Sequence, residues 1–198
     1  KAAPSPLSRE SSAASILNEE NVQMISYKAY IKADSRTAQT IASIVLKNTS
    51  DEEVKIMAGL PSHINQGTVK INNLQVIMDG VRQRISTRRN RTKAGDAGEL
   101  DLPPNWITWT VSLKPKEAKV IDIEYTTENK KADNGTIEIN IPLEYISLWY
   151  STPQIVEVTV DVGNGLPYMF EPNPSVLPHE YDEKGKLTWI YENNFPSG

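Results

Sequence analysis

Residues 25–33, with the sequence ISYKAYIKA, decide the fold class of this chain. Their odd-numbered positions carry Ile, Tyr, Ala, Ile and Ala, whereas their even-numbered positions carry Ser, Lys, Tyr and Lys. Successive side chains of an extended chain point to opposite faces, so this period of two predicts a β-strand with one buried face. Residues 41–47 repeat the pattern and predict a second half-buried strand.

Related alternation recurs along the rest of the chain. It predicts further strands over residues 54–58, 69–78, 81–87, 106–113, 119–125, 136–141, 143–150, 155–162 and 187–191. About ten or eleven short strands without a long helical period are typical of an all-β protein. We therefore expect an antiparallel β-sandwich, or two stacked ones, with Ig-like layers.

Turn residues between these strands predict how they connect. Residues 48–51 (NTSD), 79–80 (DG), 115–116 (PK) and 182–185 (DEKG) combine side chains that favour tight reversals. Each is expected to fold the two strands that flank it into a hairpin. An irregularity is expected at residues 72–73, inside a strand.

The chain is long enough for one large or two small domains, with 198 residues. Residues 1–20 are rich in Ser and Ala and predict a flexible tether, in which a short helix over residues 11–17 is the alternative. A first β-sandwich half is expected at residues 21–92, a loop or linker at 93–104 and a second half at 105–198. One continuous domain is the alternative to two halves.

Composition excludes several classes of function. A net charge of −4 gives no general attraction to nucleic acid, and no stretch reaches the roughly 20 apolar residues needed to span a bilayer. The absence of cysteine removes disulfides and thiol chemistry, and suits a reducing cytoplasm or an exported protein. The polar, proline-bearing residues 1–6 favour export, because such stretches often follow a removed signal peptide.

No motif predicts a catalytic or metal centre. His63 and His179 are far apart, and Ser62 beside His63 is adjacency rather than a triad, because sequence neighbours on a turn rarely point at each other. The Gly-rich residues 95–98 lack the Lys-Ser/Thr of a phosphate-binding loop. Acidic residues cluster at 51–53 and at 180–183. Both clusters stand at expected turns, and neither has the spacing of a calcium-binding loop. We expect no enzyme activity, no cofactor and no bound metal.

A basic run stands out against the acidic whole. It consists of Arg82, Arg84, Arg88, Arg89, Arg91 and Lys93. The favoured interpretation is a charged hairpin edge that discourages aggregation between sheets. The alternative is a ligand site, for which an anionic surface polymer is the natural class of ligand.

Aromatic side chains supply a second candidate binding surface, with Trp106 and Trp149 as its main members. Exposed rings hold sugars or peptides in many sandwich modules, although large aromatic residues are usually buried. Trp106 and Trp109 are an odd number of residues apart, so they are expected on opposite faces of one strand.

Residues 45–54 (VLKNTSDEEV), residues 59–61 (GLP) and the hairpin at 79–80 resemble secreted bacterial domains of unknown function. Residues 109–125 resemble the second half of that scheme, and the vault inter-alpha-trypsin type of sandwich has a similar layout. The resemblance covers about residues 22–160. It implies an exported, surface-associated β-sandwich and supplies no active-site residues.

Together these observations predict a non-enzymatic interaction or structural module that is extracellular or exposed on the cell envelope. Its expected partner is a cell-wall polymer or another surface protein, and not nucleic acid. The rival hypothesis is a carbohydrate-binding or carbohydrate-processing protein that uses exposed aromatic residues.

Overall fold

A computed structural model describes residues 20–64, 68–89, 105–131, 135, 137–139, 153–163, 178–182 and 184–192. Most of these residues lie in β-strands, and none of them belongs to an α-helix. The all-β prediction is therefore confirmed. Within the same ranges, no helix has the length and hydropathy that crossing a bilayer requires.

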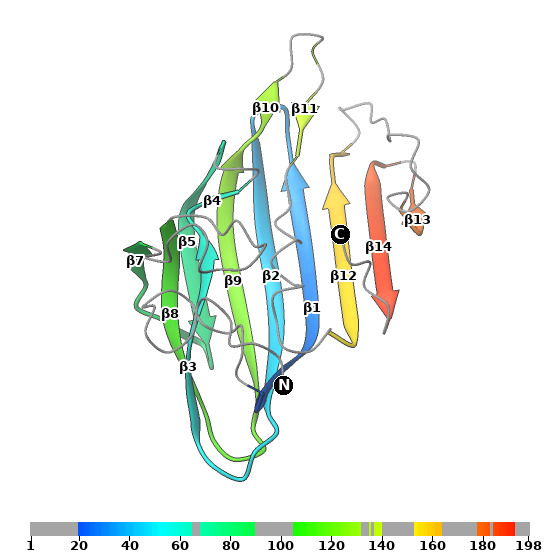
Figure 1. The fold of residues 1–198 in the computed structure, drawn as a ribbon. Coiled ribbons are helices and arrows are strands. Elements are labelled where there is room, and N and C mark those ends of the chain that lie inside the picture. The colour runs from blue at the N-terminus through cyan, green and yellow to red at the C-terminus, as the bar shows by residue number, and fades with distance from the viewer. Residues whose placement is uncertain are drawn as a thin grey trace, which may run out of the picture.

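Nine strands form one large sheet in the order β13-β14-β12-β1-β2-β9-β5-β4, with β6 also paired to β5 (Figure 1). Their bounds are Val22–Ala33 (β1), Thr37–Asn48 (β2), His63–Ile64 (β4), Val69–Met78 (β5), Val81–Arg82 (β6), Ala118–Glu128 (β9), Ile155–Asp161 (β12), Glu180–Tyr181 (β13) and Lys186–Glu192 (β14). Strands β1 and β12 pair in parallel, whereas β1 and β2 are antiparallel. The sheet is therefore mixed, which differs from the purely antiparallel arrangement expected from the sequence.

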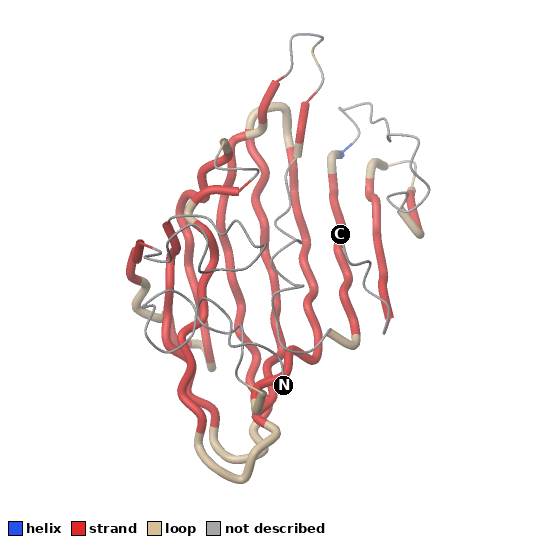
Figure 2. The backbone as a smooth tube through the Cα atoms, viewed as in Figure 1, coloured by secondary structure: helices blue, strands red, loops and turns tan. Residues whose placement is uncertain are grey.

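Two smaller sheets complete the described structure. Strands β3 (Val54–Pro61), β8 (Asn105–Leu113) and β7 (Ser86–Arg89) pair in the order β3-β8-β7. Strands β10 (Lys130–Lys131) and β11 (Ile137–Glu138) form a two-stranded sheet. Figure 2 shows the long strands of the large sheet running side by side, with the short β10 and β11 at its upper end.

The large sheet and the three-stranded sheet share one hydrophobic core. Alternate residues of β1, β2, β5, β9 and β12 turn their side chains to the same face, as the period of two requires. On that face, Val76 and Val156 are fully buried, in one cluster with Val111 and Leu113 of β8. Because β9 lies between β2 and β5, strands from both sides of residues 93–104 alternate in one sheet. The pairing therefore joins residues from both sides of the boundary that was expected at residues 93–104.

Two of the expected hairpins are wrong. The turn at residues 48–51 carries the chain from β2 in the large sheet to β3 in the small one, and residues 114–117 return it from β8 to β9. A turn motif specifies that the chain reverses, but tertiary packing decides the strand with which the next segment pairs. The two connections therefore cross between sheets.

Other local predictions are confirmed. Asp79 and Gly80 both have positive φ angles, of 52° and 74°, and join β5 to β6 as a hairpin. Strand β5 changes register between Asn72 and Gln75, as the irregularity predicted. β13 and β14 pair around residues 182–185. Residues 1–19 of the tether predicted over residues 1–20 lie outside the described residues, as do the loop at 93–104 and the strand at 143–150.

Candidate anion-binding edge

Four arginines follow one margin of the molecule. Arg82 ends β6, Arg84 lies in the connection that follows, and Arg88 and Arg89 end β7. In the described pairing, β6 pairs only with β5, and β7 only with β8. Residues 82–89 are one continuous segment that spans at most about 25 Å, so these four side chains form a row along the chain rather than a set gathered from distant segments. We call Arg82, Arg84, Arg88 and Arg89 the arginine edge.

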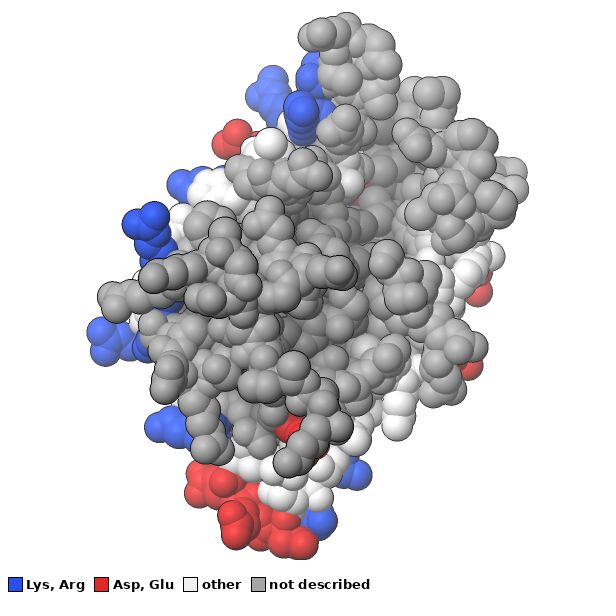
Figure 3. All heavy atoms as spheres, in the orientation of Figure 1, with Lys and Arg blue, Asp and Glu red and all other residues white. Residues whose placement is uncertain are grey.

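Charge is unevenly distributed along the margin of the face drawn in Figure 3. Figure 3 shows lysine and arginine side chains along the left-hand margin, while acidic side chains gather at the lower tip. The acidic residues of the β2–β3 connection are Asp51, Glu52 and Glu53. Residues 80–89 contain no Asp or Glu, and the preceding Asp79 forms an ion pair with Lys119 at 3.3 Å. The arginine edge is therefore a local excess of positive charge.

The side chains of the arginine edge differ in their surroundings. Arg82, Arg84 and Arg89 are exposed, and none of them forms a salt bridge within the described part of the chain. Arg88 is half-buried and lies opposite Trp106 in the β7–β8 ladder. Exposed guanidinium groups without a carboxylate partner keep their five N–H donors for other ligands.

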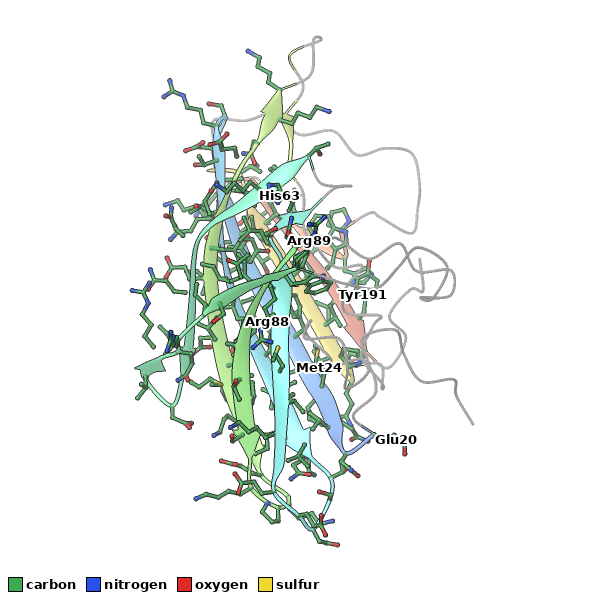
Figure 4. The ribbon with its side chains drawn as sticks, turned by 60° about the vertical axis from the view of Figure 1, so that its left-hand side comes forward. Glu20, Met24, His63, Arg88, Arg89 and Tyr191 are labelled. Carbon is green, nitrogen blue, oxygen red and sulfur yellow. The ribbon has the colours of Figure 1, made fainter. Side chains whose placement is uncertain are left out.

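Ser62 and His63 lie at one end of this edge. The Ser62 backbone N–H donates to the Asn105 carbonyl oxygen at 2.9 Å, and Asn105 is the ladder partner of Arg89. His63 pairs with Lys70 across β4 and β5. Figure 4 shows the His63 and Arg89 side chains in the same region of the molecule. These contacts add a histidine and a lysine to the neighbourhood of the arginines.

Ser62 and His63 also interact with each other, contrary to the sequence expectation. Ser62 Oγ and His63 Nδ1 are 3.0 Å apart, at the point where the chain passes from β3 of the small sheet to β4 of the large one. Nucleophilic catalysis needs a third group that orients the histidine. No described carboxylate hydrogen-bonds the His63 ring. Among the described residues, the contact is therefore a side-chain pair without the third member of a triad.

The aromatic candidates are not presented to solvent where the structure describes them. Trp106 is 3% exposed and Trp109 is 4% exposed, and only Trp109 belongs to the shared core. Their odd spacing places them on opposite faces of β8, as predicted. Trp149 and Arg91 lie outside the described residues.

The two histidines lie at opposite ends of the large sheet. His63 begins β4, while His179 precedes β13 and accepts a hydrogen bond at Nδ1 from the Ile190 backbone N–H at 2.9 Å. The described residues contain no group of three or more His, Cys, Asp or Glu arranged to hold a metal ion. A histidine metal site of the kind considered from the sequence is therefore not formed by this pair.

Sequence reasoning missed one exposed polar pair. The Tyr30 hydroxyl of β1 donates to Asp161 Oδ2 of β12 at 2.5 Å, and Asp161 also accepts from the Gly163 backbone N–H at 3.0 Å. The carboxylate raises the pKa of Tyr30, while the hydroxyl and the Gly163 amide lower the pKa of Asp161. The alternation placed each residue on the solvent-facing side of its strand. It could not show that β1 and β12 lie beside each other.

Comparison with known proteins shows a shared fold without close sequence similarity. No protein family profile and no curated protein matches the chain. A Legionella pneumophila protein with a provisional nutrient-binding role has a structure similar over 92% of this chain, with a TM-score of 0.72 and 15% identity. This chain spans 66% of that protein. Native leukotriene A4 hydrolase from Saccharomyces cerevisiae is similar over 91% of this chain and 28% of the enzyme, with a TM-score of 0.52 and 10% identity.

These likenesses establish the fold alone. At 10% to 15% identity, a function is not carried from one chain to another by shape. The chain also corresponds to only part of each of these proteins. Any function therefore has to be argued from the surface of this chain.

Proposed function

We propose that this chain is a non-enzymatic interaction module that holds an extended anionic polymer along the arginine edge. The observation that carries the proposal is the row of exposed Arg82, Arg84 and Arg89 on edge segments, without salt bridges in the described structure. Guanidinium groups bind carboxylate, phosphate and sulfate oxygens through paired N–H donors. A row suits a linear ligand better than a compact one.

If the same residues only protect the edge from aggregation, a different chemical property of their side chains matters. A charged edge that prevents strand pairing needs charge of any kind, and lysine serves as well as arginine. Recognition of planar or tetrahedral anions uses the fork of the guanidinium group, which lysine lacks. Exchange of arginine for lysine therefore separates the two interpretations.

The cellular location of the module and the packing of its two core-sharing sheets are also proposed. We propose a module exported to the cell envelope, where anionic polymers are available, and a cysteine-free fold needs no particular redox environment there. We also propose that the two core-sharing sheets form an Ig-like sandwich. Fractionation of cells that express the full-length gene tests the location: recovery in the cytosol alone would exclude it.

The carbohydrate hypothesis has less support. Trp106 and Trp109 are buried, and a ring has to be exposed before a sugar can stack on it. Trp149, the other ring on which the hypothesis depends, lies outside the described residues.

The binding experiment uses the whole chain with polyphosphate, polyglutamate and neutral dextran as probes. Replacement of Arg82, Arg84 and Arg89 by Gln should weaken polyanion binding by about tenfold, because three exposed charge contacts together contribute about 1.5 kcal/mol. A control triple variant, Lys130→Gln, Lys131→Gln and Lys184→Gln, removes the same charge elsewhere. Binding of the wild type should weaken as salt rises.

Three outcomes would overturn the proposal. The first is no binding of either polyanion by the wild type. The second is an equal loss of affinity in the control variant, which would indicate net charge alone. The third is unchanged affinity in the arginine variant together with greater aggregation, which is the result expected of a protective edge. The Arg-to-Lys triple variant should bind more weakly than the wild type.

A further inference from the structure

We infer that the solvent-facing side of the large sheet associates with a second copy of this chain. This side, here called the outer face, is the one opposite the shared core. Large hydrophobic side chains are exposed on it, with fractions of 37% for Tyr30, 50% for Ile41, 47% for Val120 and 37% for Ile155. An exposed apolar patch on neighbouring strands commonly marks a contact surface.

Strand register places these residues in two rows across the outer face. Tyr30 of β1 lies opposite Ile41 of β2, and Val45 of β2 lies opposite Val120 of β9. Ile155 of β12 pairs with Ser26 of β1. The apolar side chains therefore occupy two rows on four adjacent strands, and the row that contains Lys28, Ser43 and Asp122 lies between them.

Charges flank β2 with opposite signs. On one side, β1 presents Lys28 and Lys32, and on the other side β9 presents Asp122 and Glu124. Beyond β1, β12 presents Asp161 and Glu157, and Glu157 forms an ion pair with Lys28 at 2.8 Å. Lys28 and Asp122 belong to one row, because both pair with Ser43 of β2. The outer face of β2 itself carries no charge between residues 39 and 45.

This charge pattern is self-complementary under one arrangement. When two outer faces meet around a two-fold axis that runs along β2, β1 of each copy lies over β9 of the other. Lys28 of one copy then faces Asp122 of the second, and Ile41 meets its own symmetry mate. An axis across the strands would instead place Lys28 near Lys32, which is repulsive.

The size of the outer face fits a modest dimer. Five strands about 4.8 Å apart and about eight residues long, at about 3.3 Å each, cover about 600 Å². Stable interfaces bury about 800 Å² per partner, so this contact belongs to the weaker class. Because charged side chains lie between and beside the apolar rows, the dimer should weaken as salt rises. The inference uses no residue of the arginine edge and does not depend on polymer binding.

Sedimentation velocity of the whole chain, at concentrations up to about 500 µM, tests the inference. The wild type should shift from monomer to dimer, and Lys28→Glu and Asp122→Lys should each weaken the dimer by about tenfold or more through like-charge contacts. An equimolar mixture of these two variants should recover a dimer, because each altered charge then faces its opposite. Lys55→Glu, which changes an exposed lysine of β3 in the other sheet, is the matched control and should behave as the wild type.

Ile41→Lys provides a test that is independent of the charge pairs. It places two ammonium groups at the symmetry axis and should leave the protein monomeric. Urea denaturation of each variant distinguishes lost association from lost folding. A wild type that stays monomeric, a mixture that does not recover a dimer, or an Ile41→Lys variant that still dimerises would overturn the inference.

Discussion

The Asn48 side-chain Nδ2 donates a hydrogen bond to the Lys114 carbonyl oxygen at 2.9 Å. Asn48 is fully buried, and its Nδ2 also lies 2.7 Å from the Glu52 carbonyl oxygen, while its Oδ1 accepts from the Ser50 backbone N–H at 2.9 Å. One amide group therefore joins the β2–β3 connection to the β8–β9 connection. These are the two crossings between the large and small sheets.

Replacement of Asn48 by Ala should destabilise the fold by about 2 to 4 kcal/mol, because buried carbonyl groups lose their donors. Urea denaturation followed by circular dichroism measures the change. Ser43→Ala, on the outer face, is the control and should change the free energy of unfolding by less than about 0.5 kcal/mol. Equal stability of the two variants would contradict the role given to Asn48.

Gly185 and Gly135 form a matched pair for measuring a steric contact. Their φ angles are +85° and +86°, but a Cβ on Gly185 would lie 2.4 Å from the Gly163 carbonyl oxygen, whereas one on Gly135 would meet nothing within 4 Å. Gly135→Ala should cost about 1 kcal/mol through backbone conformation alone. Gly185→Ala should cost at least about 2 kcal/mol more. Thermal unfolding of both variants checks the difference, and equal costs would refute the close approach.

The Tyr30–Asp161 hydrogen bond predicts opposite pH dependences for its two members. The folded pKa of Asp161 is lowered from 3.8, so its contribution is present above that value and is lost as pH falls through the folded pKa. The folded pKa of Tyr30 is raised from 10.0, so its contribution is present below that value and is lost as pH rises through the folded pKa. Asp161→Asn should return the pKa of Tyr30 toward its ordinary value. NMR titration of the Tyr30 ring carbon tests this, and an unchanged pKa would exclude the contact.

The Lys28–Glu157 ion pair should contribute little to stability, although its atoms are only 2.8 Å apart. Its side chains are 56% and 36% exposed, so water and salt screen the attraction. A double-mutant cycle with Ala at both positions should give a coupling energy of about 0.5 kcal/mol or less. The cycle is measured at a protein concentration low enough for the monomer. A coupling above about 1 kcal/mol would show that the pair is less solvated than its exposure indicates.

Local patterns predicted the strands well because a period of two is a property of the chain itself. Tyr27 and Ile31 are buried on one face as the alternation predicts, whereas a register shift between Met24 and Ser26 moves Ile25 out of that set. The irregularity at residues 72–73 and the positive φ angles at Asp79 and Gly80 follow from residue types that favour them. The basic run was also visible in the sequence. What it could not show was that Arg82, Arg84 and Arg89 are exposed on edge segments without salt bridges in the described structure.

By itself, the sequence determined the all-β class, the alternation of side chains along most of each long strand and the sites of reversal, because these depend on neighbouring residues. Only the tertiary structure decided which strands pair: β12 runs parallel to β1, and the turns after β2 and β8 cross between sheets. Such pairings join residues more than 100 positions apart, as Tyr30 and Asp161 are. They depend on how the whole set of apolar faces packs into one core, which no local pattern encodes.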